Sequence, residues 1–373
     1  MDALYDVAVV GAGPAGSAAA LRALQLRPDA RVVLLDAATF PRDKTCGDGV
    51  AAAVFDLLAA LGAPGLEDLA PPVPRLRLRT PTGRVVDRAC PRPNRVVPRL
   101  VFDAALVAAA VEKGAELRHH RVRRMDVRAD RVVLDDEIGA RVVVGADGAN
   151  SAVRRMLGAP AAPPAATAVA IRGYTAHDPG REALTIEYAQ GPFPAYAWSF
   201  PVAGGGANVG YGVFDRRGSE SRQVFLDALR RLLPGQEPDP STVRGHHLPM
   251  SNGPRFHPDG RVLLAGDAAG TINPLTGEGI YDAVASGALA GQAAMAGAGA
   301  GAVHRGAMHR AFARHHRHSG ALARLMARPR FLDAAIIAAG AHQSVFDTAV
   351  DLGLARGTVP PAAFALVLAR LRP

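Results

Sequence analysis

The sequence predicts an α/β fold: a Rossmann-type dinucleotide-binding domain with an inserted antiparallel sheet lobe and a short helical C-terminal segment. Three patterns predict it. A glycine-rich loop at 11–16 joins an apolar strand to an Ala-rich helix, residues 167–214 contain alternating strand-like runs, and an apolar strand returns at 261–265. The 373 residues, 49% of them hydrophobic, are enough for a substantial core.

The dinucleotide-binding domain opens with a βαβ unit, which is typical of a parallel sheet. The unit consists of a strand over 5–10, a helix over 14–25 and a strand over 31–36. The later elements of this domain are an amphipathic helix ended by glycine and several short strands, predicted at 99–114, 116–127, 131–134, 141–144 and 261–265. We assign residues 1–74, 90–164 and 246–303 to this discontinuous domain.

The sheet lobe is predicted from residues 75–89 together with 165–245. A hairpin over 75–79 and 84–87 turns at Thr82-Gly83. Strands are expected at 184–188, 196–200 and 208–214, and a helix at 219–233 closes the lobe. Residues 304–373 are predicted to form the helical C-terminal segment.

Composition excludes several classes of protein. Two cysteines, Cys46 and Cys90, are too few for a disulfide framework or a zinc site, and we predict no metal site. No uncharged apolar run reaches the roughly 20 residues of a membrane-spanning helix. A strand begins at once near the N-terminus, so we expect no secretory leader and a cytoplasmic location.

The net charge of +9 is concentrated in 304–330, which contains seven arginines, five histidines and no acidic residue. Apolar residues recur there at helical spacing, so the segment fits either of two descriptions. It is a basic amphipathic helix in peripheral contact with the inner face of a membrane, or an ordinary surface helix. Nucleic acid is not expected as a partner, because no aromatic stacking platform accompanies the charge.

The sequence GAGPAG at 11–16 predicts dinucleotide binding. Its glycines permit a tight turn and a close approach of the pyrophosphate to the start of the following helix. Asp36 ends the second strand, where its carboxylate can accept hydrogen bonds from ribose hydroxyls. The candidate cofactor-binding residues of this unit are therefore Gly11, Gly13, Pro14, Ala15, Gly16 and Asp36. This pattern alone does not distinguish FAD from NAD.

Two later segments, VGADGANS at 144–151 and VLLAGDAAG at 262–270, each carry an apolar strand into a turn. Either aspartate by itself could simply stabilise its turn. In this order, however, the three motifs resemble the two-dinucleotide flavoproteins related to aromatic hydroxylases. The resemblance implies non-covalent FAD, with Asp267 at the ribityl chain and Asp147 and Gly148 near the pyrophosphate. It also implies that Arg99 contacts the FAD phosphates and that the main chain of Val122 contacts the adenine.

Three further segments resemble the geranylgeranyl reductase family: NPLTGEGI at 273–280, PRDKTCGDG at 41–49 and YAWSFP at 196–201. In the first, main-chain N–H groups at a helix start can stabilise the negative charge of reduced flavin. The resemblance places the second segment beside the flavin. The candidate flavin-binding residues of these two segments are Arg42, Lys44, Cys46, Gly47, Pro274, Gly277, Gly279 and Ile280.

The third segment alternates, so Tyr196, Trp198 and Phe200 share one face of a strand. They form either the core of the sheet lobe or an aromatic wall for an apolar substrate, and the neighbouring motifs favour the wall.

The resemblance implies reduction of carbon–carbon double bonds in a prenyl or polyene substrate, with hydride delivered from flavin N5. A proton must reach the other carbon, and Cys46 and Tyr196 are candidate donors. Cys46 could equally be a small buried hydrophobe. The sequence holds no second GxGxxG, so NAD(P)H or another external donor would reduce the flavin without a Rossmann domain of its own.

Two alternatives remain. One is an FAD-dependent monooxygenase or oxidase of the aromatic-hydroxylase type, acting on a natural-product intermediate. The other is a flavin-containing binding protein without turnover.

Overall fold

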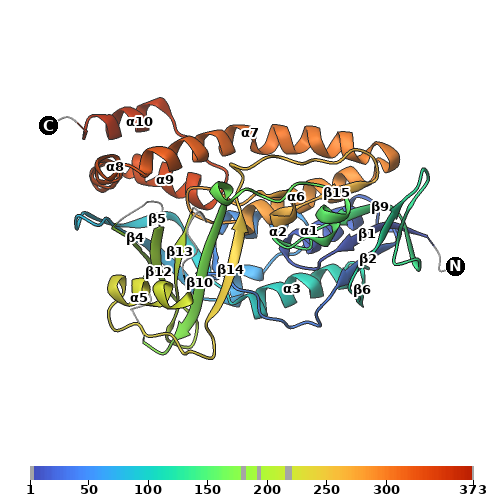
Figure 1. Ribbon diagram of the computed structural model, residues 1–373, viewed down its shortest axis with the longest axis horizontal. Helices are drawn as coiled ribbons and strands as arrows, with labels where there is room; N and C mark the ends of the chain where they lie inside the picture. Colours follow the sequence, from blue (N-terminus) through green and yellow to red (C-terminus); the bar gives the residue numbers. More distant parts are fainter. Residues whose placement is uncertain (1–3, 178–181, 191–194, 215–220, 372–373) are drawn as a thin grey trace.

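A computed structural model describes residues 4–177, 182–190, 195–214 and 221–371, and shows an α/β protein built on two sheets (Figure 1). The first sheet has the strand order β6-β2-β1-β9-β8-β7, with β15 also paired to β9. Its strands are β1 Tyr5–Val10, β2 Val32–Asp36, β6 Glu116–His119, β7 Met125–Val127, β8 Val132–Leu134, β9 Ile138–Gly145 and β15 Val262–Leu264. The pairs among β6, β2, β1, β9 and β15 are parallel, as the βαβ pattern predicts.

Three helices cover one face of this sheet: α1 Pro14–Leu26, α3 Arg99–Glu112 and α6 Ile280–Ala294. Helices α1 and α6 pack so closely that a Cβ added to Gly287 would lie 2.0 Å from the carbonyl oxygen of Ala15. A Cβ on Gly291 would lie 2.2 Å from the carbonyl oxygen of Ala19. Small residues therefore set the distance between the two helices.

The second sheet has the order β14-β10-β13-β12-β11-β4-β5-β3. Its strands are β3 Gly49–Val50, β4 Pro72–Arg79, β5 Val85–Val96, β10 Thr167–Thr175, β11 Ala183–Tyr188, β12 Ala195–Pro201, β13 Ala207–Val213 and β14 Arg244–Pro249. Neighbouring strands are antiparallel except for the pair β11–β4. The expected antiparallel sheet lobe is present.

Helices cover both faces of the second sheet (Figure 1). Helix α5 Arg222–Leu232 packs on β10, β12 and β13 with its own apolar cluster. The opposite face carries a cluster shared with α8 Pro329–Ala341, α9 Gln343–Leu354 and α10 Pro361–Leu368. Helix α7 Ala300–Met326 connects the two regions, because Phe312 lies in the core of the first sheet and Met326 in that of the second.

The burial of α7 bears on the basic segment at 304–330. Met308, Phe312 and Met326 are at most 8% exposed and pack in the protein's own cores, and peripheral membrane contact stays a prediction. The segment is therefore a partly buried helix with its arginines outside. In the described part of the chain, no helix combines the length and apolar character needed to cross a bilayer.

Some elements differ from those predicted. The two segments of the sheet lobe were predicted to end at 89 and 245, but strand β5 continues to 96 and strand β14 to 249. The division into domains stays a prediction. Val122 lies in the loop between β6 and β7 and not in a strand. Helix α2 Ala52–Ala60 was not expected. Of the helix predicted over 219–233, residues 219 and 220 fall outside the described chain, and α5 accounts for the rest.

Candidate active site

The glycine-rich loop brings main-chain atoms into close contact. A Cβ on Gly16 would lie 1.8 Å from the carbonyl oxygen of Gly11, and one on Gly11, whose φ is +96°, would lie 2.4 Å from that of Ala146. Helix α1 then starts with Gly13 as N-cap and Pro14 at its first turn, with no acidic residue and no capping side chain there. Its first N–H groups are thus available to an anion such as a pyrophosphate.

Asp36 stands at the end of β2 beside this loop. Its Oδ2 accepts a hydrogen bond from the main-chain N–H of Ala12 at 2.8 Å, and its Oδ1 accepts one from Ala38 at 2.9 Å. These bonds fix the carboxylate in the position expected of a ribose-binding acid.

Two arginines reach the same loop. Arg99 makes a bidentate pair with Asp103, at 2.6 and 2.8 Å, and Arg42 contacts the same carboxylate at 3.0 Å. A Cβ on Gly13 would lie 3.4 Å from Arg42 Nη2 and 3.8 Å from Arg99 Nη2. Asp103 Oδ2 lies equally close, at 3.8 Å, so two arginines and one carboxylate leave one net positive charge at this helix start, which fits the phosphates of FAD.

Asp147 orders the loop after β9. Its carboxylate accepts hydrogen bonds from the Ser151 hydroxyl at 2.5 Å and from the main-chain N–H of Ala152 at 2.6 Å. Ser151 is the N-cap of the short helix α4 Ala152–Met156, and Asp147 bonds the free N–H groups of the first residues of that helix. A Cβ on Gly11 would lie only 2.8 Å from the Cα of Asp147, so this loop and the glycine-rich loop are in contact. Gly148 follows with φ +77°.

Asp267 follows β15, and its Oδ2 lies 3.1 Å from Lys44 Nζ. Burial opposes ionisation there, but the charge and hydrogen bond of Lys44 together lower the pKa of Asp267. The carboxylate therefore stays ionised and can only accept hydrogen bonds.

The segment 273–280 forms a tight turn that leads into α6. Asn273 Oδ1 accepts a hydrogen bond from Leu275 N, and Gly277 has φ +71°, a conformation that favours glycine. Gly279 is the N-cap of α6, and Ile280 begins it. The hydroxyl of Tyr196 donates a hydrogen bond to the carbonyl oxygen of Thr276, which ties this turn to the second sheet.

Two carboxyl groups at this site, the partly buried Glu278 and the buried Asp48, were not predicted as functional. Glu278 Oε1 accepts hydrogen bonds from Ile280 N at 2.7 Å and Tyr281 N at 3.0 Å; burial, aided by the charge of Asp282, raises its pKa to about 8. Asp48 is fully buried at φ +62° and accepts hydrogen bonds from the hydroxyl of Tyr174 and the amide of Asn208; burial raises its pKa to about 6. Asp48 lies in the motif at 41–49 and Glu278 in the motif at 273–280, but neither motif predicts how far these side chains are buried.

A cavity of about 320 Å³ joins these loops to the second sheet. At one end it is lined by Pro14, Arg99 and Asp267, and at the other by Phe331, Phe346 and Phe364 of the C-terminal helices. Tyr196, Trp198 and Phe200 lie along its wall. A Cβ on Gly210 would lie 2.1 Å from Trp198 Cζ2, so only glycine leaves room for this indole.

Cys46 and Gly47 also line the cavity. Burial raises the pKa of the Cys46 thiol, which therefore keeps its proton at neutral pH. Val122 is buried in its loop beside the first sheet, in the apolar cluster that also contains Val33 and Leu35 of β2.

Comparisons with known proteins agree with this arrangement. Residues 4–179 match the family model described as an FAD binding domain. The chain is 34% identical to a menaquinone reductase of Mycolicibacterium smegmatis, over 78% of this chain and 76% of the relative. It is 35% identical to digeranylgeranylglycerophospholipid reductase 2 of Methanopyrus kandleri, over 78% of this chain and 76% of that protein.

Among solved structures, a geranylgeranyl bacteriochlorophyll reductase-like protein of Thermoplasma acidophilum shares the fold, with a TM-score of 0.80. The two are 20% identical, and the similarity covers 98% of this chain and 96% of that one. The fold, the FAD-binding loops and the extended sequence identity give one answer: the chain belongs to the geranylgeranyl reductase family of FAD-dependent oxidoreductases.

Proposed function

We propose that this enzyme reduces carbon–carbon double bonds in a long prenyl or polyene substrate. The observation that carries the proposal is the single cavity that runs from the flavin-facing turn at Gly277–Gly279 to the apolar end between the second sheet and α8, α9 and α10. A chain held there would have one double bond beside the flavin and its remainder among apolar side chains. Relatives named for menaquinone and for a digeranylgeranyl lipid support an apolar substrate.

When bound, FAD would supply the hydride from N5, and the protein would position the alkene and exclude water. An external reductant, NAD(P)H or another donor, must restore the reduced flavin. The N-terminal end of α6 would lie beside the ring, where the helix dipole would favour negative charge on reduced flavin, while the N–H groups of Ile280 and Tyr281 are bonded to Glu278.

The protein must also hold a proton near the second carbon of the alkene. Glu278, Cys46 and Tyr196 all line the cavity, and burial favours the protonated form of each. The hydroxyl of Tyr196 already donates to Thr276 O, and proton donation would require it to leave that bond. Glu278 and Cys46 are therefore the preferred proton-holding groups, with Tyr196 as the third.

The decisive experiment uses flavin-loaded protein reduced with dithionite in the absence of oxygen. Menaquinones, prenylated lipids and prenyl diphosphates are added singly, and flavin absorbance and product mass are followed. We expect the oxidised spectrum to return with one substrate class and its product to gain two mass units per reduced bond. For menaquinone, tandem mass spectrometry must place the added hydrogens in the isoprenoid tail, because reduction of the quinone ring also adds two mass units.

Two results would contradict the proposal. If no polyene reoxidises the flavin, but air does so with a product gaining sixteen mass units, the enzyme is a monooxygenase. If the reduced flavin is inert to every acceptor, the protein binds flavin without turnover.

A further inference from the structure

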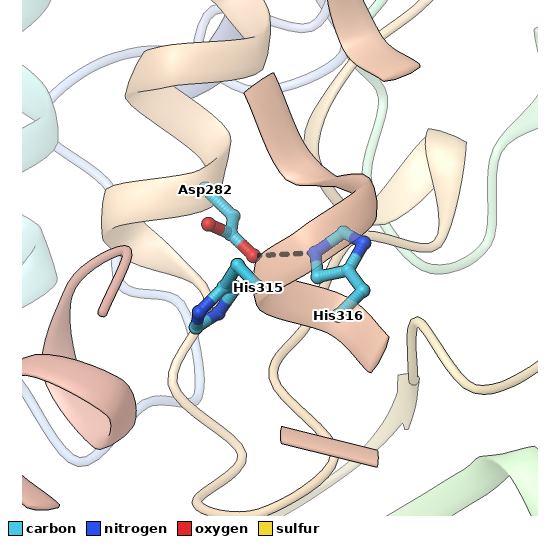
Figure 2. A group of neighbouring side chains, drawn as sticks. All are labelled: Asp282, His315 and His316. Carbon is cyan, nitrogen blue, oxygen red and sulfur yellow. Dashed lines mark hydrogen bonds and ion pairs between the residues drawn. The ribbon is translucent and has the colours of Figure 1, made fainter. Parts of the chain in front are cut away.

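Away from the cavity wall, three buried side chains meet where α6 crosses α7: Asp282, His315 and His316 (Figure 2). Their exposed fractions are 1%, 1% and 7%. Each offers one oxygen or nitrogen ligand atom, and these atoms all lie within 4.8 Å of one another. An imidazole pair and a carboxylate gathered in the interior is a donor set that Zn²⁺ commonly uses.

The hydrogen bonds within the cluster are incomplete. His316 Nε2 lies 3.2 Å from Asp282 Oδ2, the contact dashed in Figure 2. Asp282 Oδ1 and His315 Nε2 are buried without a hydrogen-bond partner. Buried polar atoms are normally paired, and an unpaired carboxylate oxygen is costly. The two unpaired atoms, Asp282 Oδ1 and His315 Nε2, both carry lone pairs. They indicate a missing partner that accepts lone pairs, such as a metal ion.

Both imidazoles are oriented by other contacts. His315 Nδ1 lies 2.9 Å from the carbonyl oxygen of Gly357, a bond in which the ring donates and Nε2 keeps its lone pair. The His316 ring stacks on Phe312, with centroids 5.3 Å apart and planes 13° apart. Zinc-binding histidines characteristically donate their other ring N–H to a carbonyl or carboxylate. The Gly357 contact has this form.

Charge favours the same interpretation. Among the described residues, the ion pairs of Asp282 include no lysine or arginine, only the imidazole of His316, which is charged only when protonated. A buried carboxylate without a lysine or arginine among these partners requires a counter-charge, and a divalent cation supplies one.

We propose that Asp282, His315 and His316 bind one Zn²⁺ ion, with water or the second oxygen of Asp282 completing the coordination. The site would join α6, whose first turn faces the flavin, to α7. Through His315 it would also hold the segment at Gly357 between α9 and α10. Its role is to fix the C-terminal helices over the cavity, and the inference does not depend on which substrate the cavity accepts.

The test uses flavin-loaded protein without a histidine tag. Zinc content is measured by mass spectrometry after gel filtration, and affinity by competition with a chromophoric chelator. We expect about one zinc per chain in the wild type. Asp282→Asn and His315→Gln should each weaken binding by at least about 10-fold, since even outer-shell partners contribute that much. His309→Gln is the matched control, because His309 lies on the same helix but is exposed.

Thermal unfolding keeps the test valid if a variant folds poorly. Chelator should lower the midpoint of the wild type and of His309→Gln, and added Zn²⁺ should restore it. Wild-type protein that binds zinc no more tightly than Asp282→Asn would overturn the proposal. The proposal would also be overturned if neither chelator nor zinc changed the unfolding midpoint of the wild type. The cluster would then be a metal-free Asp282–His316 ion pair.

Discussion

Glu278 is a carboxylic acid at the start of a helix and on the wall of an apolar cavity, and these two positions act on its charge in opposite directions. The N–H groups of Ile280 and Tyr281 favour the carboxylate. Burial, together with Asp282, favours the neutral acid and prevails, raising the pKa to about 8. The neutral acid is therefore favoured beside the turn at 273–280, which we propose to contact the flavin.

The raised pKa predicts a pH-dependent stability. In the unfolded chain Glu278 ionises near 4.5, and in the folded protein near 8, so its contribution to the free energy of unfolding falls as pH rises between these values. Glu278→Gln stays neutral and should escape this loss. One pKa unit corresponds to about 1.4 kcal/mol. The free energy of unfolding of the variant minus that of the wild type should therefore be larger at pH 9 than at pH 5, by roughly 2–4 kcal/mol.

Urea unfolding of the flavin-loaded proteins at pH 5, 7 and 9 measures this difference. Glu112→Gln is the control, because Glu112 is exposed at the end of α3. Its stability should parallel that of the wild type at all three values. Parallel curves for Glu278→Gln and wild type would show that Glu278 is ionised throughout.

At the scale of elements, the crossing of α1 and α6 is set by glycine. A side chain on Gly287 meets the main chain of Ala15, which cannot rotate away as a side chain could. Because α1 begins at the glycine-rich loop and α6 at the flavin-facing turn, their separation also fixes the distance between these two parts of the site.

Gly287→Ala should therefore cost both stability and flavin. We expect the free energy of unfolding to fall by about 1–3 kcal/mol, the usual cost of overpacking, and less FAD to remain bound after gel filtration. Gly340→Ala in α8 is the matched control, since a Cβ there meets nothing within 4 Å. It should gain about 0.5–1 kcal/mol by helix propensity. Equal stability and flavin content in both variants would refute this account of the crossing.

The elements that the sequence predicts well are those with local signals. Strand β1 and helices α1 and α3 lie within two residues of their expected bounds, because apolar runs and a terminal glycine mark them. Strand β5 continues past the predicted end at 87 and through Pro91 and Pro93, residues that disfavour regular strands and here lie in its irregular second half. Strand β14 carries His246 and His247, and only its pairing with β10 makes it a strand.

The same distinction holds within the site. The loops containing Gly11, Asp147 and Asp267 could be predicted because each follows an apolar strand of one parallel sheet. Asp48 and Glu278 could not be recognised as buried acids. Asp48 is covered by the second sheet, where its partner Asn208 is 160 residues away in sequence. Glu278 lies on the wall of a cavity that the C-terminal helices also line.

At the scale of the molecule, the cavity crosses from the flavin-binding region to the C-terminal helices, so its two ends can be changed separately. Ala339 of α8 is buried at the far end, whereas Ala341 on the same helix is exposed. Ala339→Phe should shorten the cavity and lower kcat/KM for long prenyl chains by about 10-fold or more, a loss of about 1.4 kcal/mol, with little effect on short ones.

Ala341→Phe is the control and should behave as wild type. Steady-state reduction of a series of chain lengths measures the effect. An equal loss for short and long substrates, or a loss of bound flavin, would show that α8 does not limit chain length.

FAD should also stabilise the whole molecule, since its candidate ligands come from segments as distant as Gly11 and Gly279. Flavin at 100 times its dissociation constant should add about 2.7 kcal/mol to the free energy of unfolding. Removing FAD should lower the thermal midpoint, and returning it should raise the midpoint with concentration. A midpoint independent of FAD would mean that the folded and unfolded chains bind it equally.

The space that Gly210 leaves for Trp198 also gives the protein a built-in optical probe. Trp198 is the only tryptophan in the sequence, and its indole stands in the wall of the cavity that reaches the flavin-binding loops. Indole emission overlaps flavin absorption, so a bound isoalloxazine should quench it by energy transfer. Because the sequence has one tryptophan, all tryptophan fluorescence comes from Trp198 in the cavity wall. Arrival of the cofactor and entry of a polyene could be timed in a stopped-flow instrument without attaching any dye.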